Sequence, residues 1–239
     1  YLGTDHREFA VQPKAAEVLE DIAWHFDEPF ADSSALPTWY VCQMARQNVT
    51  VALSGDGGDE SFGGYTFRYR PHLLESRVRQ ALPTWFRSLA FGALGEVYPG
   101  SSKLPRHLRL KTYLQNLAVS DGQAFYQDLA WLTPADRDRL YARGFWEALK
   151  GYSPLEEVFP KYASSDAPDP LGRAQHTDIR FYMTEDVLVK VDRMSMAHAL
   201  EVRSPLLDHR VMEFAATLPA RLKLQGGQGK VLLRQAAKK

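Results

Sequence analysis

The most informative stretch of this chain reads Val49-Thr50-Val51-Ala52-Leu53-Ser54-Gly55-Asp56-Gly57-Gly58-Asp59-Glu60-Ser61-Phe62-Gly63-Gly64-Tyr65. Its first five residues are apolar or β-branched and carry no charge, which predicts a short buried strand over 49–53. Five glycines and three acidic residues follow within 54–64, and this composition predicts a loop with special backbone geometry. A buried strand that ends in such a loop is typical of the edge where open parallel sheets bind ligands.

The chemistry of this loop indicates a cation and an anionic ligand. Its glycines let backbone N–H groups come close to an anion, while Asp56, Asp59 and Glu60 crowd three carboxylates together. Two carboxylates about 6–8 Å apart repel by roughly 2–3 kcal/mol at an effective dielectric constant of about 20. Such a cluster is stable when it is solvated, holds a cation or keeps one member protonated. The alternative is an ordinary turn. The glycine pattern matches neither the phosphate loop of nucleotide hydrolases nor a calcium loop.

Composition narrows the class of protein. The chain of 239 residues has 29 basic and 29 acidic side chains, so its net charge gives no electrostatic case for nucleic acid or an anionic membrane. No apolar run approaches the roughly 20 residues that span a bilayer, and no signal segment opens the chain. The single Cys42 excludes an internal disulfide and indicates a reducing, cytoplasmic compartment, with an inert core thiol. The start without Met indicates a piece of a longer protein.

Two helices are predicted before the stretch 49–65. Apolar residues recur at helical spacing over 15–26 and indicate an amphipathic helix. The segment 27–37 predicts a loop with three carboxylates, in which Ser33 or Ser34 caps a helix over 36–47. This loop either faces the same ligand region or is a capping loop whose acids are solvated.

The remainder of the chain is predicted to be helical. Residues 65–82 indicate a surface helix with basic and aromatic residues, and 104–132 indicate one or two helices. The apolar stripe over 174–200 predicts one long helix whose charged residues lie on a solvated face. Asp208 is placed to cap a further helix over 209–217. No internal repeat is found.

The last motif of the chain is Leu224-Gln225-Gly226-Gly227-Gln228-Gly229-Lys230, with Lys230 opening a helix. Three glycines before a lysine predict either a mobile loop that delivers an ammonium group to an anion or a flexible turn with a surface lysine. The residues alone leave both readings open.

Four motifs occur in the chain, in this order: Asp27-Glu28-Pro29-Phe30-Ala31-Asp32-Ser33-Ser34, Leu53-Ser54-Gly55-Asp56-Gly57-Gly58-Asp59-Glu60 with Phe62-Gly63-Gly64-Tyr65, Lys190-Val191-Asp192-Arg193-Met194-Ser195-Met196-Ala197 with Glu201-Val202-Arg203-Ser204-Pro205-Leu206-Leu207-Asp208, and Gly229-Lys230-Val231-Leu232-Leu233-Arg234. Together they resemble the synthetase domain of the glutamine-hydrolysing asparagine synthetases. The resemblance covers nearly the whole chain, although 83–165 contributes little. It implies an α/β, helix-dominated domain over 1–239. The implied fold is of the adenine-nucleotide-α-hydrolase (pyrophosphatase) type, with a parallel sheet and a helical C-terminal part.

The resemblance implies a reaction and its residues. Such enzymes use ATP with Mg²⁺ to convert aspartate to a β-aspartyl-adenylate, which ammonia from glutamine then attacks. Ser54 and Gly55 match the ATP-binding segment, and Asp56 matches the carboxylate that takes a proton from ammonia. Asp59 matches a magnesium ligand that also serves the nucleotide. Lys230 matches the lysine that stabilises charge on the phosphorus and leaving pyrophosphate.

Other residues receive weaker assignments from the resemblance. Arg203 and Asp192 match positions to which we assign only positioning, and the role of residues 27–34 stays open. The expected partners are small molecules, namely aspartate, ATP and ammonia from glutamine, without nucleic acid or membrane. A homodimer is a further prediction.

Two parts of the family pattern are not found in this sequence. They are the Ser-Gly-Gly-x-Asp-Ser pyrophosphate loop, expected upstream of the strand at 49–53, and the N-terminal glutaminase domain with its cysteine nucleophile. We therefore expect a domain truncated at its N-terminal side, which by itself is inactive and binds ATP weakly or not at all. Family members carry Glu or Asp at position 56, and Asp has the shorter reach.

Two alternatives stand beside this prediction. The first is a related ATP-dependent amidotransferase or amide ligase that acts on another carboxylate. Its β-lactam-forming members tend to have Tyr where Asp56 stands, which disfavours that version. The second is a degenerate, non-catalytic domain, which the presence of Asp56, Asp59 and Lys230 disfavours.

Overall fold

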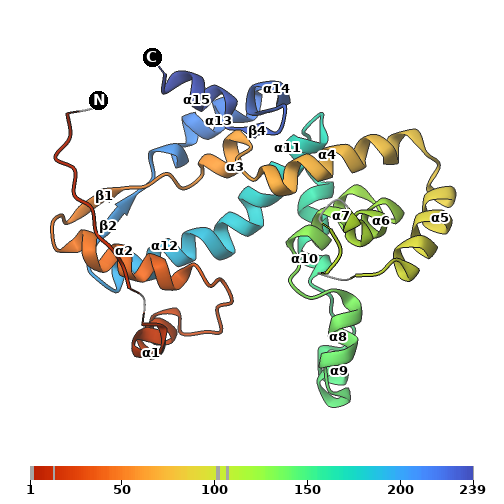
Figure 1. The fold of residues 1–239 in the computed structure, drawn as a ribbon, viewed down its shortest axis with the longest axis horizontal. Helices are drawn as coiled ribbons and strands as arrows, with labels where there is room; N and C mark the ends of the chain where they lie inside the picture. The colour runs from red at the N-terminus through yellow and green to blue at the C-terminus, as the bar shows by residue number, and fades with distance from the viewer. Residues whose placement is uncertain (1–2, 13, 101–102, 106–107, 239) are drawn as a thin grey trace. The chain divides into compact units, whose positions relative to one another are not determined.

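The computed structural model describes residues 3–12, 14–100, 103–105 and 108–238. Figure 1 shows the order of its elements, which are mostly helices with four short strands in the described part of the chain. The helix-dominated α/β prediction is therefore confirmed at the level of secondary structure. None of the helices in these described ranges is long and apolar enough to cross a membrane.

The chain forms two compact units. Unit 1 comprises Tyr1–Gly57 and Tyr182–Met212, and unit 2 comprises Gly58–Phe181 and Glu213–Lys239. The stretch 49–65 is thus divided between the two units after Gly57, the fourth residue of the predicted loop over 54–64.

Unit 1 contains a two-stranded parallel sheet. Strand β1 (Val51–Leu53) pairs with β2 (Glu201–Arg203), with Ala52 opposite Val202. The predicted strand and its parallel pairing are confirmed, but the prediction that it is buried is wrong, because Val51 is 40% and Leu53 73% exposed. The reason is that β1 has one strand beside it and little packed on its faces. The sequence pattern missed β2, whose three residues show no apolar run.

Three helices form the core of unit 1. They are α1 (Ala15–Phe26), α2 (Ala35–Arg46) and α12 (Leu188–Met196), of which α2 and α12 lie side by side in Figure 1. Their buried side chains are Ile22, Phe26, Ala35, Trp39 and Met194. Both predicted N-terminal helices are confirmed, and Cys42 on α2 is buried as expected.

Unit 2 is built from many short helices. In chain order they are α3 (Gly58–Phe62), α4 (Thr66–Ala81), α5 (Thr84–Val97), α6 (Lys111–Ala118), α7 (Asp121–Leu129), α8 (Pro134–Leu140), α9 (Arg143–Leu149), α10 (Leu155–Ala163), α11 (Pro170–Thr177), α14 (Ala220–Lys223) and α15 (Val231–Ala236). A hairpin of β3 (Leu224–Gln225) and β4 (Gln228–Gly229) precedes α15. The core contains Tyr69, Phe125, Tyr162, Leu171 and Ala174. The prediction of one or two helices over 104–132 is confirmed by α6 and α7.

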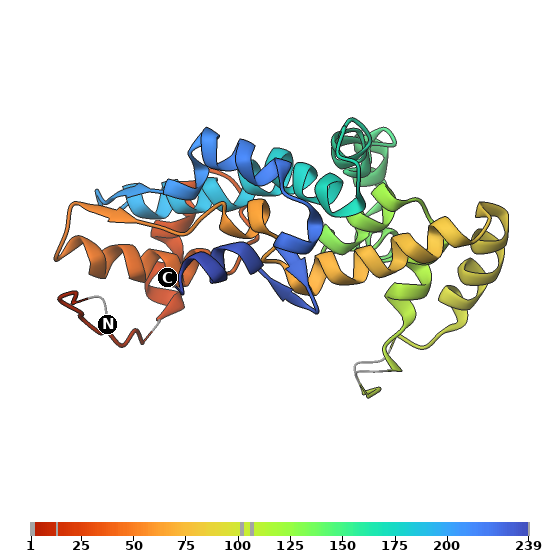
Figure 2. The same ribbon diagram turned by 90° about the horizontal axis from the view of Figure 1, so that it is seen from above.

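Helix α4 is not the surface helix that its basic residues predict. It runs without interruption through Pro71 (Figure 2), and its Arg68, His72, Glu75 and Arg79 are buried. Each buried cation has a carboxylate partner from another helix or turn, so these charges are tolerated inside the unit. The sequence pattern could not reveal this because the partners are distant in the chain.

The predicted long helix over 174–200 runs continuously to Met196, where α12 ends, but it is not α-helical throughout. Between α11 and α12 lies a π-helical stretch, η2 (Asp178–Val187). A π-helix has a wider turn than the period assumed by the pattern, so side chains shift relative to the expected faces. Asp178 is in consequence fully buried, where a solvated face was expected, and Arg68 holds it by an Nη2–Oδ2 contact of 2.7 Å.

One of the two predicted helix caps is present. The Oδ1 atom of Asp208 accepts a bond from the Arg210 backbone N–H at 2.9 Å, at the start of α13 (His209–Thr217). Ser34 occupies the N-cap of α2, but its hydroxyl donates to Asp32 instead of capping the helix. A nearby charged acceptor is the stronger hydrogen-bond partner.

Candidate functional site

The unit 1 half of the glycine-rich loop continues the parallel sheet. The Ser54 backbone N–H donates to the Arg203 carbonyl at 2.9 Å, and the Ser54 and Ser204 hydroxyls lie 2.7 Å apart. Both strands therefore end at Ser54 and Ser204, at the carboxyl edge where parallel sheets bind ligands. Gly55 follows on the surface and Asp56 is half-buried.

Only glycine fits at position 57. Its φ is +83°, and a Cβ built there would lie 2.2 Å from Cδ2 of Leu207. The turn after Asp56 is thus held tightly against the segment that follows β2. The backbone geometry predicted from the glycines is present at this position.

The unit 2 half is a helix rather than a loop. The sequence predicted a continuous glycine-rich loop over 54–64, but α3 begins at Gly58. Asp59 lies in its first turn and forms an ion pair with Lys230, with 3.0 Å between Oδ2 and Nζ. Negative charge is favourable in the first turn of a helix, where Asp59 lies.

Gly64 makes room for this ion pair. Its N–H donates to the Asp59 carbonyl at 2.8 Å, and a Cβ at position 64 would lie 1.8 Å from Oδ1 of Asp59. The same Cβ would lie 2.5 Å from Cε of Lys230. The close approach of carboxylate, ammonium and backbone therefore requires glycine.

Lys230 directly follows the β3–β4 hairpin, whose turn lies in the predicted glycine segment. Gly226 and Gly227 form its turn with φ values of +58° and +83°, as hairpin turns of this kind require. Lys230 itself has φ +55°, and its N–H donates to the Phe62 carbonyl at 3.0 Å. A left-handed non-glycine residue is strained, and this strain occurs where the hairpin meets α15.

A cavity of about 480 Å³ opens beside the ion pair in unit 2. Its lining includes Asp59, Gly64, the glycines of the hairpin, Lys230 and Arg234. The volume is typical of small-molecule sites. One carboxylate and two cations can bind an anion and, through the carboxylate, a hard metal ion.

A buried hydrogen-bond chain supports α3 and the hairpin. Gln175 donates from Nε2 to the Glu60 carbonyl at 2.6 Å, and its Oε1 accepts from Nζ of Lys223 at 2.9 Å. Lys223 directly precedes the hairpin, and burial lowers its pKa. Sequence reasoning missed Gln175 and Lys223, because no motif or spacing distinguishes them from surface residues.

A second charged group lies in unit 1. The Nζ atom of Lys190 lies 2.6 Å from Oδ2 of Asp32, which also accepts bonds from the Ser34 N–H and hydroxyl. Burial by itself raises the pKa of Asp32, but Lys190 and Ser34 hold it down, to about 2. Burial and the Asp32 charge raise the pKa of Asp186 to about 6. The acids of the 27–37 loop are therefore not all solvated, and Lys190 is a site residue that the sequence analysis did not single out.

Arg203 and Asp192, to which the sequence analysis assigned only positioning, are both exposed. Arg203 is exposed and pairs with Glu201 at 2.7 Å, while its carbonyl serves the sheet. Asp192 is exposed on α12, and its carbonyl accepts from the Ser195 hydroxyl. Of the predicted catalytic and cofactor residues, the structure brings Asp59 and Lys230 together in unit 2. Ser54, Gly55 and Asp56 belong to unit 1.

Comparison with known proteins gives consistent results. The profile of the asparagine synthase family matches residues 1–239. A Mycobacterium tuberculosis protein named for glutamine-hydrolysing asparagine synthetase is 35% identical over 222 residues, which are 91% of this chain and 31% of that protein. Asparagine synthetase [glutamine-hydrolyzing] 1 of Bacillus subtilis is 34% identical over 92% of this chain and 33% of its own length.

More distant relatives carry other names. Amidase chry2 of Gibberella zeae is 22% identical over 92% of this chain and 34% of that protein. The chain spans about a third of the length of the curated relatives it matches. No solved structure matches it.

Proposed function

The chain belongs to the asparagine synthase family, and we propose that it carries the ATP-dependent step that activates aspartate for amidation to asparagine. In this proposal the aspartate side chain becomes a β-aspartyl-adenylate, and ammonia released from glutamine elsewhere in the protein forms the amide. Glutamine hydrolysis appears in the names of the most similar relatives, which are longer than this chain.

The observation that carries the proposal is the Asp59–Lys230 pair beside a cavity lined by glycines. Two groups of opposite charge, 3.0 Å apart, are held where glycine leaves space for a ligand. An ammonium group stabilises negative charge that develops on phosphate oxygens, and a carboxylate suits a hard cation bound to them. We assign Lys230 to the leaving pyrophosphate.

Asp59 fits a magnesium site by its chemistry. Its carboxylate supplies two oxygen donors, one facing Lys230 and one facing Gly64, and it borders the cavity. Bound Mg²⁺ would neutralise phosphate charge. The chain's own part is to hold that carboxylate rigidly through α3, and to keep Lys230 within reach through the hairpin.

Unit 1 supplies the remaining proposed roles. Ser54 and Gly55 lie at the carboxyl edge of the sheet, where the backbone can approach a nucleotide. We assign Asp56 to proton removal from the attacking ammonia, a role for which a carboxylate must come within hydrogen-bond distance of the substrate nitrogen. We further propose a homodimer for the natural protein.

A second candidate is amidation of a different carboxylate by the same activation chemistry. The observation that favours it is the presence of distant relatives named amidase, at 22% and 23% identity. A non-catalytic role is disfavoured, because Asp56, Asp59 and Lys230 are all retained.

ATP–pyrophosphate exchange by the natural protein that carries this chain tests the proposal. We expect exchange to depend on aspartate, because adenylation requires a carboxylate acceptor. Lys230→Ala and Asp59→Asn should each lower the rate by about 100-fold or more, since each removes charge stabilisation at the phosphates. The matched control is Lys14→Ala, which breaks an exposed Lys–Glu pair of the same 3.0 Å length in unit 1.

Each outcome has a distinct meaning. Exchange with another carboxylate but not with aspartate would transfer the assignment to the second candidate. If no tested carboxylate supports exchange, adenylation at this site is contradicted. Equal exchange rates in Lys230→Ala and the control would contradict it as well.

A further inference from the structure

The interior of unit 2 contains a cluster of polar side chains that the proposed reaction does not use. His72 and Glu75 lie three residues apart on α4 and therefore on the same face, and Asp128 comes from α7. One ligand atom from each lies within 4.8 Å of the others. His72 is 0% and Glu75 1% exposed, while Asp128 is partly buried.

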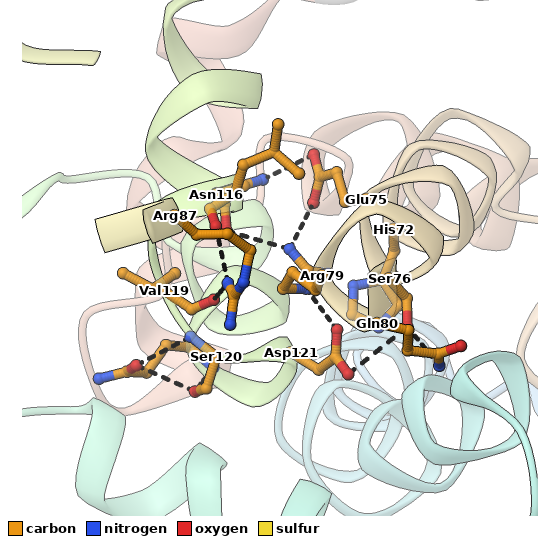
Figure 3. A network of polar contacts seen from close by, with 12 residues as sticks. His72, Glu75, Ser76, Arg79, Gln80, Arg87, Asn116, Val119, Ser120 and Asp121 are labelled. Carbon is orange, nitrogen blue, oxygen red and sulfur yellow. Dashed lines mark hydrogen bonds and ion pairs between the residues drawn. The ribbon is translucent and has the colours of Figure 1, made fainter. Parts of the chain in front are cut away.

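Neighbouring groups hold the two carboxylates from their outer sides. Figure 3 shows Arg79 between Glu75 and Asp121, with its Nη1 3.4 Å from Oε2 of Glu75. The amide nitrogen of Asn116 lies 3.2 Å from Oε1 of Glu75 and 2.9 Å from Oδ1 of Asp128. Glu75 Oε1 and Asp128 Oδ1 therefore both face the amide nitrogen of Asn116.

The cluster is rich in carboxylates. Glu75, Asp128 and Asp121 are three carboxylates, and Arg79 is bonded to Glu75 and Asp121. Buried carboxylates persist when they are paired, protonated or bound to a metal, so this group can accept a further positive partner.

Three buried atoms of the cluster have no hydrogen-bond partner in the described part of the chain: His72 Nδ1, Asp128 Oδ2 and Asn116 Oδ1. The other ring nitrogen of His72 lies 2.9 Å from the Tyr162 hydroxyl. A hydrogen-bond partner on one imidazole nitrogen orients the ring so that the other nitrogen can bind a metal.

We propose that His72, Glu75 and Asp128 bind a divalent transition-metal ion in the interior of unit 2. Asn116 supplies a fourth donor, because a half-turn of its amide exchanges the nitrogen for the unpartnered Oδ1 with almost no change of shape. One imidazole nitrogen with three oxygens suits Zn²⁺, Mn²⁺ or Fe²⁺ better than Ca²⁺ or Mg²⁺. The ion joins α4, α6 and α7, and its role is structural.

Cobalt binding to the natural protein, stripped with a chelator, tests this site. We expect one Co²⁺ per chain with visible d–d absorption, and a melting temperature that rises with Zn²⁺. Glu75→Gln keeps the shape of the side chain and removes a ligand charge, so it should weaken Co²⁺ binding by more than about tenfold. The matched control is Asp59→Asn, which removes a carboxylate next to the proposed nucleotide site and should leave the absorption unchanged.

Crystals of the unaltered protein grown with Zn²⁺ give a measurement that needs no variant. An anomalous peak among His72, Glu75 and Asp128 is expected. No peak there, or no stoichiometric Co²⁺, would overturn the metal site and leave a hydrogen-bonded network. Absorption lost in Asp59→Asn but kept in Glu75→Gln would place the ion at the nucleotide site and would also overturn the proposal.

Discussion

At the scale of single residues, the site depends on glycines at positions where a Cβ atom would overlap neighbouring side chains. Gly57 and Gly64 leave no space for a Cβ, and Gly64 in particular faces both partners of the Asp59–Lys230 pair. The motif that carries these glycines was recognisable in the sequence. The reason for each glycine was visible only with the neighbouring side chains in place.

Gly64→Ala should break the pair while leaving the fold largely intact. Its Cβ would lie 1.8 Å from Asp59 Oδ1, so the carboxylate must move, at a cost of about 1–3 kcal/mol in unfolding free energy. We expect pyrophosphate exchange to fall by about tenfold or more. Gly144→Ala is the matched control, because a Cβ there meets nothing within 4 Å. Equal exchange rates in the two variants would contradict the role given to Gly64.

The charged group of unit 1 predicts opposite pH effects from its two acids. The pKa of Asp32 is lowered to about 2, so its contribution to stability is present above pH 4 and is lost as the pH falls from about 4 to 2. The pKa of Asp186 is raised to about 6, so its contribution is present below pH 4 and is lost as the pH rises towards 6.

Asp32→Asn should therefore lower the pKa of Asp186 towards its usual range, because a neighbouring negative charge is removed. Carboxyl ¹³C NMR titration of the two proteins measures this change directly. Asp192→Asn, which removes an exposed carboxylate from the same helix, should leave the pKa of Asp186 unchanged. An identical titration of Asp186 in wild type and Asp32→Asn would show that the two acids are not coupled.

At the scale of elements, unit 2 joins short helices by buried hydrogen bonds. Helix α3 has five residues and could not form alone, because isolated helices of this length do not persist in water. Gln175 of α11 forms hydrogen bonds both to the Glu60 carbonyl of α3 and to Lys223 of α14. This connection links the element that carries Asp59 to the hairpin that carries Lys230.

Gln175→Leu should destabilise unit 2 by about 2–3 kcal/mol, since the buried Lys223 ammonium loses its acceptor. The double variant Gln175→Leu with Lys223→Met should be more stable than the single one, because no unpaired cation remains. Urea unfolding of both variants measures the difference. If the stability loss of the double variant equals the sum of the losses in Gln175→Leu and in Lys223→Met alone, then the Gln175–Lys223 hydrogen bond does not carry the stability assigned to it.

At the scale of the whole molecule, local signals predicted local structure well. The helices over 15–26 and 36–47 and the strand within 49–53 all appear close to their predicted bounds. Predictions failed where partners are remote in the chain. The helix face near 178, which was expected to be solvated, contains a buried ion pair. The helix over 65–82, which was expected at the surface, has a buried polar face. The segment 224–230 contains a hairpin.

The sequence by itself determined the helices over 15–26 and 36–47, the family that the motifs indicate, and which residue types reach the site. Periodicity, capping and glycine content act over a few residues, so they can be read without a structure. Only the tertiary structure decided that Asp59 meets Lys230, that Ser54 extends β1 beside β2, and that His72, Glu75 and Asp128 share one interior point. These contacts join segments far apart in the chain, and their energy depends on burial and on the partner's charge, which no local pattern records.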